Sequence, residues 1–257
     1  MTGFRQHPFR VIGRFIWFGG EILIAVFDFL VHCAFCPADS APAARALWLH
    51  RAARRTGRII RLKVQSSGPI PASGLLICNH LSYVDIIVLV SLSPAMFVAK
   101  SDIKSWPVIG WLTRLAGTIF IDRERRLHVG QINDEIENAL SRGALVIIFP
   151  EGTSSDGQTV LPFKSSLLEP ATRPGRPVSV GLIQYDSGGD DDGGAICYWG
   201  EDTFFPHLLN LFGRRNVRAR VRFAPVESSG ADRKELAQQL HARLLKLKDA
   251  AVDWKQP

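Results

Sequence analysis

Two side chains that can exchange a proton lie close together in an apolar part of the sequence. His80 and Asp85 are five positions apart in the stretch ICNHLSYVDII, residues 77–87. An aspartate bonded to one ring nitrogen of a histidine fixes its tautomer and leaves the other nitrogen free as a base. Asn79 and His80 follow the strand-like run LLIC, and open α/β sheets place their sites at the carboxyl ends of strands. The spacing fits a His–Asp dyad, and it equally fits a structural histidine beside a capping aspartate.

No convincing nucleophile accompanies this pair in the sequence. Ser82 is near, but its position does not make a triad, and the G-x-S-x-G elbow of many serine hydrolases is absent. A hydrolase that attacks lipid esters with Ser82 or Ser154 is therefore disfavoured. A dyad without a nucleophile suits direct activation of a substrate hydroxyl.

Two further apolar runs end in residues that suit ligand binding. AGTIFIDRERR, residues 116–126, ends a strand-like run with Arg123, whose guanidinium suits bidentate phosphate recognition. IIFPEGTSSDG, residues 147–157, ends another run with Glu151, Gly152 and Thr153, and the glycine lets the backbone approach a ligand closely. We expect these residues to share one sheet edge with His80.

The elements that must position these residues alternate along the chain. Helical faces are expected over residues 128–143 and 233–248. Continuous apolar strands between helices predict an α/β fold, with a mostly parallel sheet covered by helices on both faces. The expected strands are residues 75–78, 95–100, 117–122, 144–149, 177–183, 195–199 and 217–223.

The positive charge of the chain is concentrated at its beginning. The net charge is +7, and residues 1–63 hold ten basic and three acidic residues, a balance of +7 that leaves residues 64–257 neutral. A basic segment indicates contact with an anionic surface, and the apolar neighbours of these charges favour lipid over nucleic acid. We therefore expect a membrane partner and no nucleic acid.

Residues 12–35 form an apolar run that is long enough to cross a bilayer, which needs about 20 residues. Arg14, Glu21 and Asp28 are seven apart, so they share one face of a helix. Acidic groups are costly inside a lone spanning helix, which favours a helix in the interface or one packed on a second helix. A second helix is expected after Ser40 and Pro42, with arginines reaching lipid phosphates. A single spanning anchor and a helix buried in the fold are the alternatives.

These patterns divide the chain into a membrane-associated helical segment, residues 1–63, and an α/β catalytic region, residues 64–257. Cys33 and Cys36 form a CxxC pair without a second ligand pair at a suitable spacing, so reduced structural thiols are expected rather than a metal site. The aspartates of residues 186–194 lie among glycines, which is typical of a solvated loop.

The order of four motifs resembles the glycerolipid acyltransferases of the 1-acylglycerol-3-phosphate acyltransferase type. The resemblance covers roughly residues 74–183, and the N-terminal segment fits it as well. One such motif alone is weak, but four in order at fitting intervals are specific. The motifs are NHLSYVD at residues 79–85, GTIFIDR at 117–123, FPEGT at 149–153 and PV at 177–178.

This resemblance implies a role for each matching residue. His80 would take a proton from the acceptor hydroxyl, and Asp85 would orient it. The hydroxyl would attack the thioester of an acyl-carrier protein or acyl-coenzyme A, without an acyl-enzyme, metal or prosthetic group. Arg123 would hold the acceptor phosphate, while Gly117, Glu151, Gly152 and Thr153 would shape its site. The reaction would convert 1-acyl-sn-glycerol-3-phosphate to phosphatidic acid at the cytoplasmic face of the inner membrane.

Two positions depart from the family pattern. FPEGT is often followed by an arginine that contacts phosphate, and here the residue is Ser154. A glycine often follows the downstream Phe-Lys, whereas this chain has PFKSS, in which Lys164 could replace the lost cation. These features, with WGEDTFFPHL at residues 199–208, are similar to family members that acylate lyso-ornithine lipids. A lyso-ornithine lipid or another lysolipid is thus the alternative acceptor, and a non-catalytic membrane-binding protein is a distant one.

Overall fold

The computed structural model describes residues 7–106, 108–121, 129–186, 196–227 and 232–250. Seven strands form one sheet in the order β1-β7-β6-β2-β5-β3-β4. All neighbouring pairs are parallel except β6 and β7. The prediction of a mostly parallel α/β sheet is therefore confirmed. The strands are β1 Leu62–Ser67, β2 Gly74–Cys78, β3 Met96–Lys100, β4 Ile119–Ile121, β5 Leu145–Ile148, β6 Val178–Tyr185 and β7 Val217–Val226.

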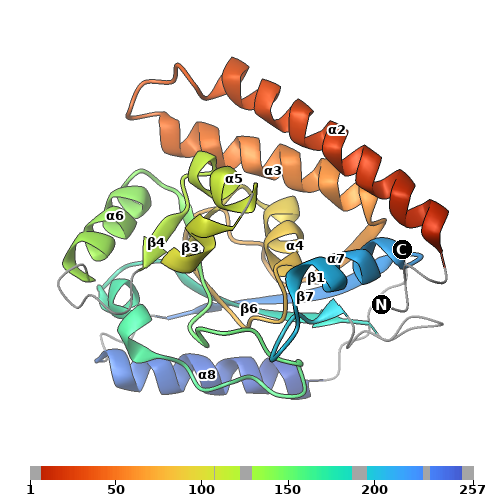
Figure 1. Cartoon of the computed structure of the whole chain (residues 1–257). Helices are drawn as coiled ribbons and strands as arrows, with labels where there is room; N and C mark the ends of the chain where they lie inside the picture. Colours follow the sequence, from red (N-terminus) through yellow and green to blue (C-terminus); the bar gives the residue numbers. More distant parts are fainter. Residues whose placement is uncertain (1–6, 107, 122–128, 187–195, 228–231, 251–257) are drawn as a thin grey trace.

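Helices cover both faces of this sheet (Figure 1). On one face α4 and α7 pack directly and α2 and α3 lie above them, whereas α6 and α8 cover the other face. The helices are α2 Pro8–His32, α3 Ala41–Ile59, α4 Val84–Leu92, α5 Ile109–Leu115, α6 Val129–Ser141, α7 Phe204–Gly213 and α8 Arg233–Asp249, with short 3₁₀ turns η1 Ser101–Ser105, η3 Ser165–Leu167 and η4 Glu169–Thr172.

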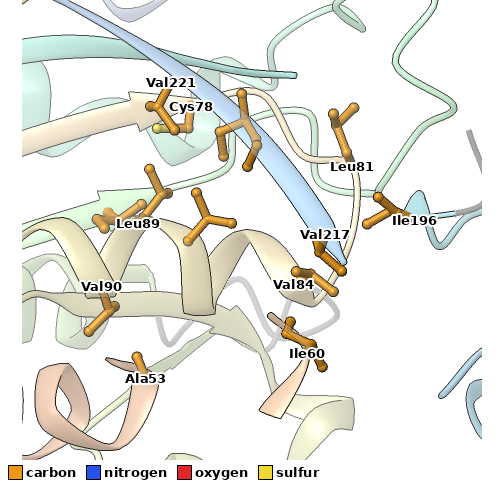
Figure 2. Packing of buried hydrophobic residues seen from close by; sticks show 14 of the residues in the cluster. Ala53, Ile60, Cys78, Leu81, Val84, Leu89, Val90, Ile196, Val217 and Val221 are labelled. Carbon is orange, nitrogen blue, oxygen red and sulfur yellow. The ribbon is translucent and has the colours of Figure 1, made fainter. Parts of the chain in front are cut away.

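Strand β2 shows why this arrangement follows from its sequence. Successive side chains of a strand point to opposite faces. Leu76 and Cys78 accordingly enter the core beneath α4, while Leu75 and Ile77 enter the core beneath α8. Figure 2 shows the first of these cores, in which Cys78 of β2 and Val221 of β7 lie over Leu89 of α4. A strand buried on both faces must be apolar throughout, as this one is.

The connections leave β2 and β5 in opposite directions. The chain leaves β2 for α4 on one face, and it leaves β5 for η3 and η4, which pack into the core of the other face. Because β2 and β5 are neighbours, their carboxyl ends lie side by side at a switch point of the sheet. Ligands of open α/β sheets bind at such switch points. The sequences that follow the two strands are NHLSYVD and FPEGT.

Helices α2 and α3 pack together through buried charges. Glu21 of α2 accepts from Arg55 of α3 at 2.6 Å, and Asp28 accepts from Arg51 at 2.9 Å and from Arg55 at 3.3 Å. These arginines hold the pKa of Asp28 below its usual value against the effect of burial. The expected acidic stripe therefore faces a second helix. The prediction that the α3 arginines reach lipid is wrong for Arg51 and Arg55, because carboxylates of α2 hold them.

The opposite face of α2 is apolar and exposed. Within the described residues, α2 is the one helix that is long and apolar enough to cross a membrane. Only 17% of its most apolar 18-residue stretch is buried. An apolar face of this extent outside the protein interior marks a membrane or protein contact. Its exposed large residues are Phe9, Ile12, Ile16, Trp17, Leu23, Ile24, Phe27, Leu30 and Val31.

One strand prediction is wrong, and several elements were not predicted. Residues 196–199 do not form a strand. Ile196 and Cys197 are buried in an irregular segment, and Tyr198 donates its amide to the Leu81 carbonyl outside any sheet. Apolar composition alone does not distinguish a buried loop from a strand. The sequence interpretation also missed β1, α5 and α7. The aspartate-rich residues 187–194 lie outside the described ranges.

We predict that Glu21→Ala lowers the free energy of unfolding by about 2 kcal/mol, because it removes the main partner of a largely buried guanidinium. Arg55 is 23% exposed and retains Asp28, which limits the loss. Chemical denaturation of the detergent-solubilised protein measures the effect. Asp39→Ala is the control, since Asp39 is 95% exposed in its pair with Arg142 and its loss should change stability by less than ~0.5 kcal/mol. Equal losses in both variants would contradict the prediction.

Candidate active site

His80 and Asp85 form a hydrogen-bonded pair at the carboxyl end of β2. His80 Nδ1 lies 2.8 Å from Asp85 Oδ2. The aspartate is completely buried in the first turn of α4, whereas the histidine side chain is 23% exposed. An acceptor at Nδ1 places the ring proton there and leaves the lone pair on Nε2. No hydrogen bond within the described residues engages Nε2. This nitrogen therefore keeps its lone pair at the carboxyl end of β2.

Asp85 holds the turn between β2 and α4 together. Its Oδ2 atom also accepts the backbone amides of Leu81 at 2.7 Å and Ser82 at 3.0 Å. Its Oδ1 atom accepts the hydroxyl of Tyr185, at the end of β6, at 2.7 Å. Burial and the neighbouring Asp85 carboxylate raise the pKa of Tyr185 well above its usual value, so this hydroxyl remains a donor. Both oxygens of the buried carboxylate therefore have donors.

Asn79 joins the ends of β2 and β6. Its buried side chain accepts from the Ile183 amide at 2.7 Å and donates to the Ile183 carbonyl at 3.0 Å. This paired contact replaces ladder bonds where β2 leaves the sheet. It also sets the position of the next residue, His80. Asn79 is thus a positioning residue, and Tyr185 is a second one that the sequence interpretation missed because it lies 100 residues from Asp85.

The segment after β5 packs against His80. Phe149 stacks on the His80 ring, with centroids 4.3 Å apart, and Glu151 Oε1 accepts the His80 amide at 3.3 Å. The Ser155 amide donates to the His80 carbonyl at 3.0 Å. Gly152 adopts a φ of 73°, a left-handed conformation that favours glycine and turns the chain beneath the histidine. The structure therefore joins NHLSYVD and FPEGT at one edge, as expected.

Glu151 is an unusual residue of this segment. It is 2% exposed, and its Oε2 atom is buried without a hydrogen-bond partner in the described residues. Burial raises its pKa to about 8, and the Asp85 charge adds to the increase. A protonated carboxyl has one hydrogen to donate. Glu151 can therefore offer both a donor and an acceptor beside His80.

The remaining predicted site residues do not all lie here. Thr153 is exposed next to Gly152, and the Lys164 amide donates to the Pro150 carbonyl, which keeps its exposed side chain near the motif. Gly117 precedes β4, away from the dyad, beneath the Arg45 side chain. Arg123 lies outside the described residues, so its predicted phosphate contact stays a prediction.

The candidate nucleophiles do not support a covalent acyl-enzyme. Ser82 is buried, and its hydroxyl accepts the Val84 amide at 3.3 Å. The Ser154 hydroxyl donates to the Tyr198 carbonyl. Cys78 is buried, and desolvation raises its pKa well above the usual value, which keeps it a thiol. None of these three side chains is thus an evident nucleophilic partner for His80.

The geometry defines an α/β protein with a histidine–aspartate pair at the switch point of its sheet and, within the described residues, no evident nucleophile placed beside that pair. Comparison with known proteins agrees with this class. A family model described as Acyltransferase matches residues 61–180. A crystal structure of the 1-acyl-sn-glycerophosphate (LPA) acyltransferase PlsC from Thermotoga maritima superimposes with a TM-score of 0.66 and covers 98% of this chain and all of that one, at 20% identity. That match shows the common fold.

Sequence relatives extend over much of the chain. A lyso-ornithine lipid O-acyltransferase of Pseudomonas aeruginosa is 36% identical over 69% of each chain. The Rhizobium meliloti protein of that name is 34% identical over 78% of this chain and 74% of its own length. A 1-acyl-sn-glycerol-3-phosphate acyltransferase of Neisseria gonorrhoeae is 38% identical over 54% of this chain and 59% of its own. The chain belongs to the acyltransferase family, and the resemblance inferred from its motifs is confirmed.

We predict that Tyr185→Phe lowers kcat about tenfold with little change in KM, because Asp85 loses one donor and holds His80 less firmly. A carboxylate with one donor fewer attracts the imidazolium more strongly, so the acid limb of the pH–rate profile should move to higher pH. Tyr198→Phe is the matched control, because its hydroxyl makes no contact with Asp85. An unchanged pH profile and kcat in Tyr185→Phe would remove this residue from the positioning network.

We also predict that Glu151 makes stability depend on pH. Its pKa is about 8 in the folded protein, against 4.5 for an ordinary glutamate, so the folded state binds more protons than the unfolded state between these values. Stability should therefore fall as pH rises from about 4.5 to 8. Glu151→Gln should flatten this part of the profile. Denaturation at a series of pH values, compared between the two proteins, measures it, and parallel profiles would contradict a raised pKa.

Proposed function

We propose that this protein transfers a fatty acyl chain from an acyl thioester to the free hydroxyl of a lysolipid. The observation that carries the proposal is the His80–Asp85 pair, whose Nε2 has no hydrogen-bond partner and no evident nucleophile beside it within the described residues. Membership of the acyltransferase family supports the reaction, and the names of the relatives support a lysolipid acceptor. An acyl-carrier protein or coenzyme A would carry the acyl group.

In the proposed mechanism, the acceptor hydroxyl gives its proton to His80 Nε2 while its oxygen attacks the thioester carbonyl. The imidazolium is stabilised by Asp85, which is already hydrogen-bonded to Nδ1. Collapse of the tetrahedral intermediate breaks the carbon–sulfur bond, and the leaving thiolate takes the proton from the imidazolium. The products are an ester and a free thiol. These reaction steps require no metal, prosthetic group or acyl-enzyme, so both substrates are bound beside His80 at the same time.

We further propose that the reaction takes place at the cytoplasmic face of the inner membrane. A monoacyl lipid stays in the bilayer, so the base must reach the interface. The exposed apolar face of α2 supports membrane attachment. Thioester donors are carried in the cytoplasm, which is the basis for the choice of face. The predicted division at residue 63 stays a prediction.

Two acceptors are supported by different observations. For 1-acyl-sn-glycerol-3-phosphate, the support is the four motifs and the name of the Neisseria relative. For a lyso-ornithine lipid, the support is the two relatives that match more of the chain, and Ser154. The Ser154 hydroxyl is held by the Tyr198 carbonyl, so the position after FPEGT provides no cation for phosphate. Acylation of a lysolipid is common to both.

The test is acyl transfer by purified protein from acyl-carrier protein and acyl-coenzyme A to a panel of lysolipids. We expect His80→Ala to reduce turnover at least ~10³-fold with folding unchanged, as expected for loss of a general base. His32→Ala is the matched control, because His32 is an exposed residue of α2 far along the chain from the dyad. An active, folded His80→Ala protein would contradict the base role. Transfer to only one acceptor in the panel would identify the head group.

A further inference from the structure

A second candidate binding site lies beside β4, the edge strand of the sheet next to β3. A shallow hollow of about 500 Å³ is lined by Arg45 of α3, Lys104 of η1, Arg114 of α5, Gly117, Phe120 of β4 and Glu135 of α6. Its described lining carries three cations and one carboxylate. We propose that this hollow binds the phosphate group of a bilayer phospholipid, at a site separate from the one that performs acyl transfer.

Within the described residues, none of the three cations has a carboxylate partner. Lys104 Nζ lies 4.6 Å from the centre of the Phe120 ring, and Arg114 donates to the Lys104 carbonyl at 3.2 Å. Glu135, the acidic residue of the described lining, forms no ion pair with any of them within the described residues. Three cations that share a lining with one carboxylate leave a net positive charge, and an anion between them relieves the remaining repulsion. The arrangement is suited to a phosphate, which accepts from several donors at once.

Arg45 gives the most direct indication of an anion site. Its Nε atom is buried and has no hydrogen-bond partner within the described residues. Other arginines of α3 differ, because Arg51 and Arg55 are neutralised by the carboxylates of α2. Gly117 has a φ of 72°, which favours glycine, and the Arg45 side chain lies in van der Waals range of its backbone, so the two line the hollow together. A desolvated donor aimed at such a hollow calls for an acceptor.

The hollow is too far from the dyad to hold the phosphate of an acceptor in the reacting position. Strand β4 is separated from β2 by β5 and β3, and three strand spacings amount to about 14 Å. In addition, Gly117 stands before β4, whereas His80 follows β2, so the two lie toward opposite ends of parallel strands. A lysolipid whose hydroxyl contacts His80 therefore cannot reach the hollow with its own phosphate.

The surroundings favour a lipid as the source of the phosphate. Helix α5 carries Trp111, which is 47% exposed, and begins beside Val108, which is 50% exposed. Tryptophan is enriched where a protein meets the polar layer of a membrane. Leu112 and Leu115 of the same helix pack with Trp48 of α3 and Phe29 of α2. Figure 1 shows α5 below α3, with α2 beyond it, so the helix that carries Trp111 lies on the same side of the molecule as the exposed apolar helix.

The test is binding of dihexanoyl phosphatidylglycerol to the full-length His80→Ala protein in neutral detergent, measured by titration calorimetry. This soluble lipid is neither the proposed acceptor nor its product, and the variant cannot turn over. We expect saturable binding of one lipid per chain. Arg45→Gln and Arg114→Gln should each weaken it about tenfold, the loss expected for one charge-assisted contact. Arg114 is exposed, so its variant keeps the test valid if Arg45→Gln fails to fold.

Arg58→Gln is the matched control, because Arg58 is an exposed arginine of α3 that does not line the hollow. It should change the affinity less than twofold. An equal loss in Arg58→Gln, or binding that never saturates, would overturn the site. Inorganic phosphate that binds as tightly as the lipid, with the same sensitivity to Arg45→Gln, would overturn the lipid source. Acyl transfer by the protein with intact His80 is measured separately, so failure of this site is distinguishable from failure of the proposed reaction.

Discussion

The buried carboxylate of Asp85 is the constraint on which the site depends. A charge removed from water is tolerated only when its lone pairs are occupied. Here the donors are the ring of His80, the amides of Leu81 and Ser82, and the hydroxyl of Tyr185. They come from the turn after β2 and from the end of β6. Satisfying this one group therefore fixes the histidine, the start of α4 and the distance between two strands.

A second set of buried charges accounts for the basic N-terminal segment. The charge balance of +7 in residues 1–63 led to the expectation that its arginines meet lipid. The structure divides them into groups with different partners. Arg51 and Arg55 bind carboxylates of α2, and Arg14 donates to the Phe212 and Arg214 carbonyls at the end of α7. Part of the positive charge thus joins elements of the fold, and net charge overstates what remains for a membrane.

Local sequence patterns predicted the residues of the site more completely than they predicted the elements of the fold. The end of β2 at Cys78 was predictable because a uniformly apolar run stops at Asn79. The end of β5 was predicted at residue 149, before Pro150, which is one residue beyond its end in the structure. The dyad was predictable because His80 and Asp85 are neighbours in sequence. Tyr185 was not, because no local pattern links it to a residue 100 positions earlier. Strand β1, LKVQSS, was not predicted because it is a half-exposed edge strand with polar residues. Ile196 and Cys197 led to a wrong strand prediction because residues of a buried loop are apolar too.

Helix α7 connects α2, the helix with the exposed apolar face, with the dyad, which bears on how the proposed base would serve a lysolipid in the bilayer. At its end, Arg14 of α2 binds the Phe212 carbonyl at 2.9 Å, and Phe15 packs edge-on against the Phe212 ring. Toward its start, His207 lies 2.9 Å from the hydroxyl of Tyr83, which precedes α4 and follows the dyad turn. Burial lowers the pKa of His207, so this contact joins neutral groups and is less sensitive to salt than an ion pair. Because α7 is held at both ends, the proposed membrane attachment through α2 would set the position of His80 relative to the lipid.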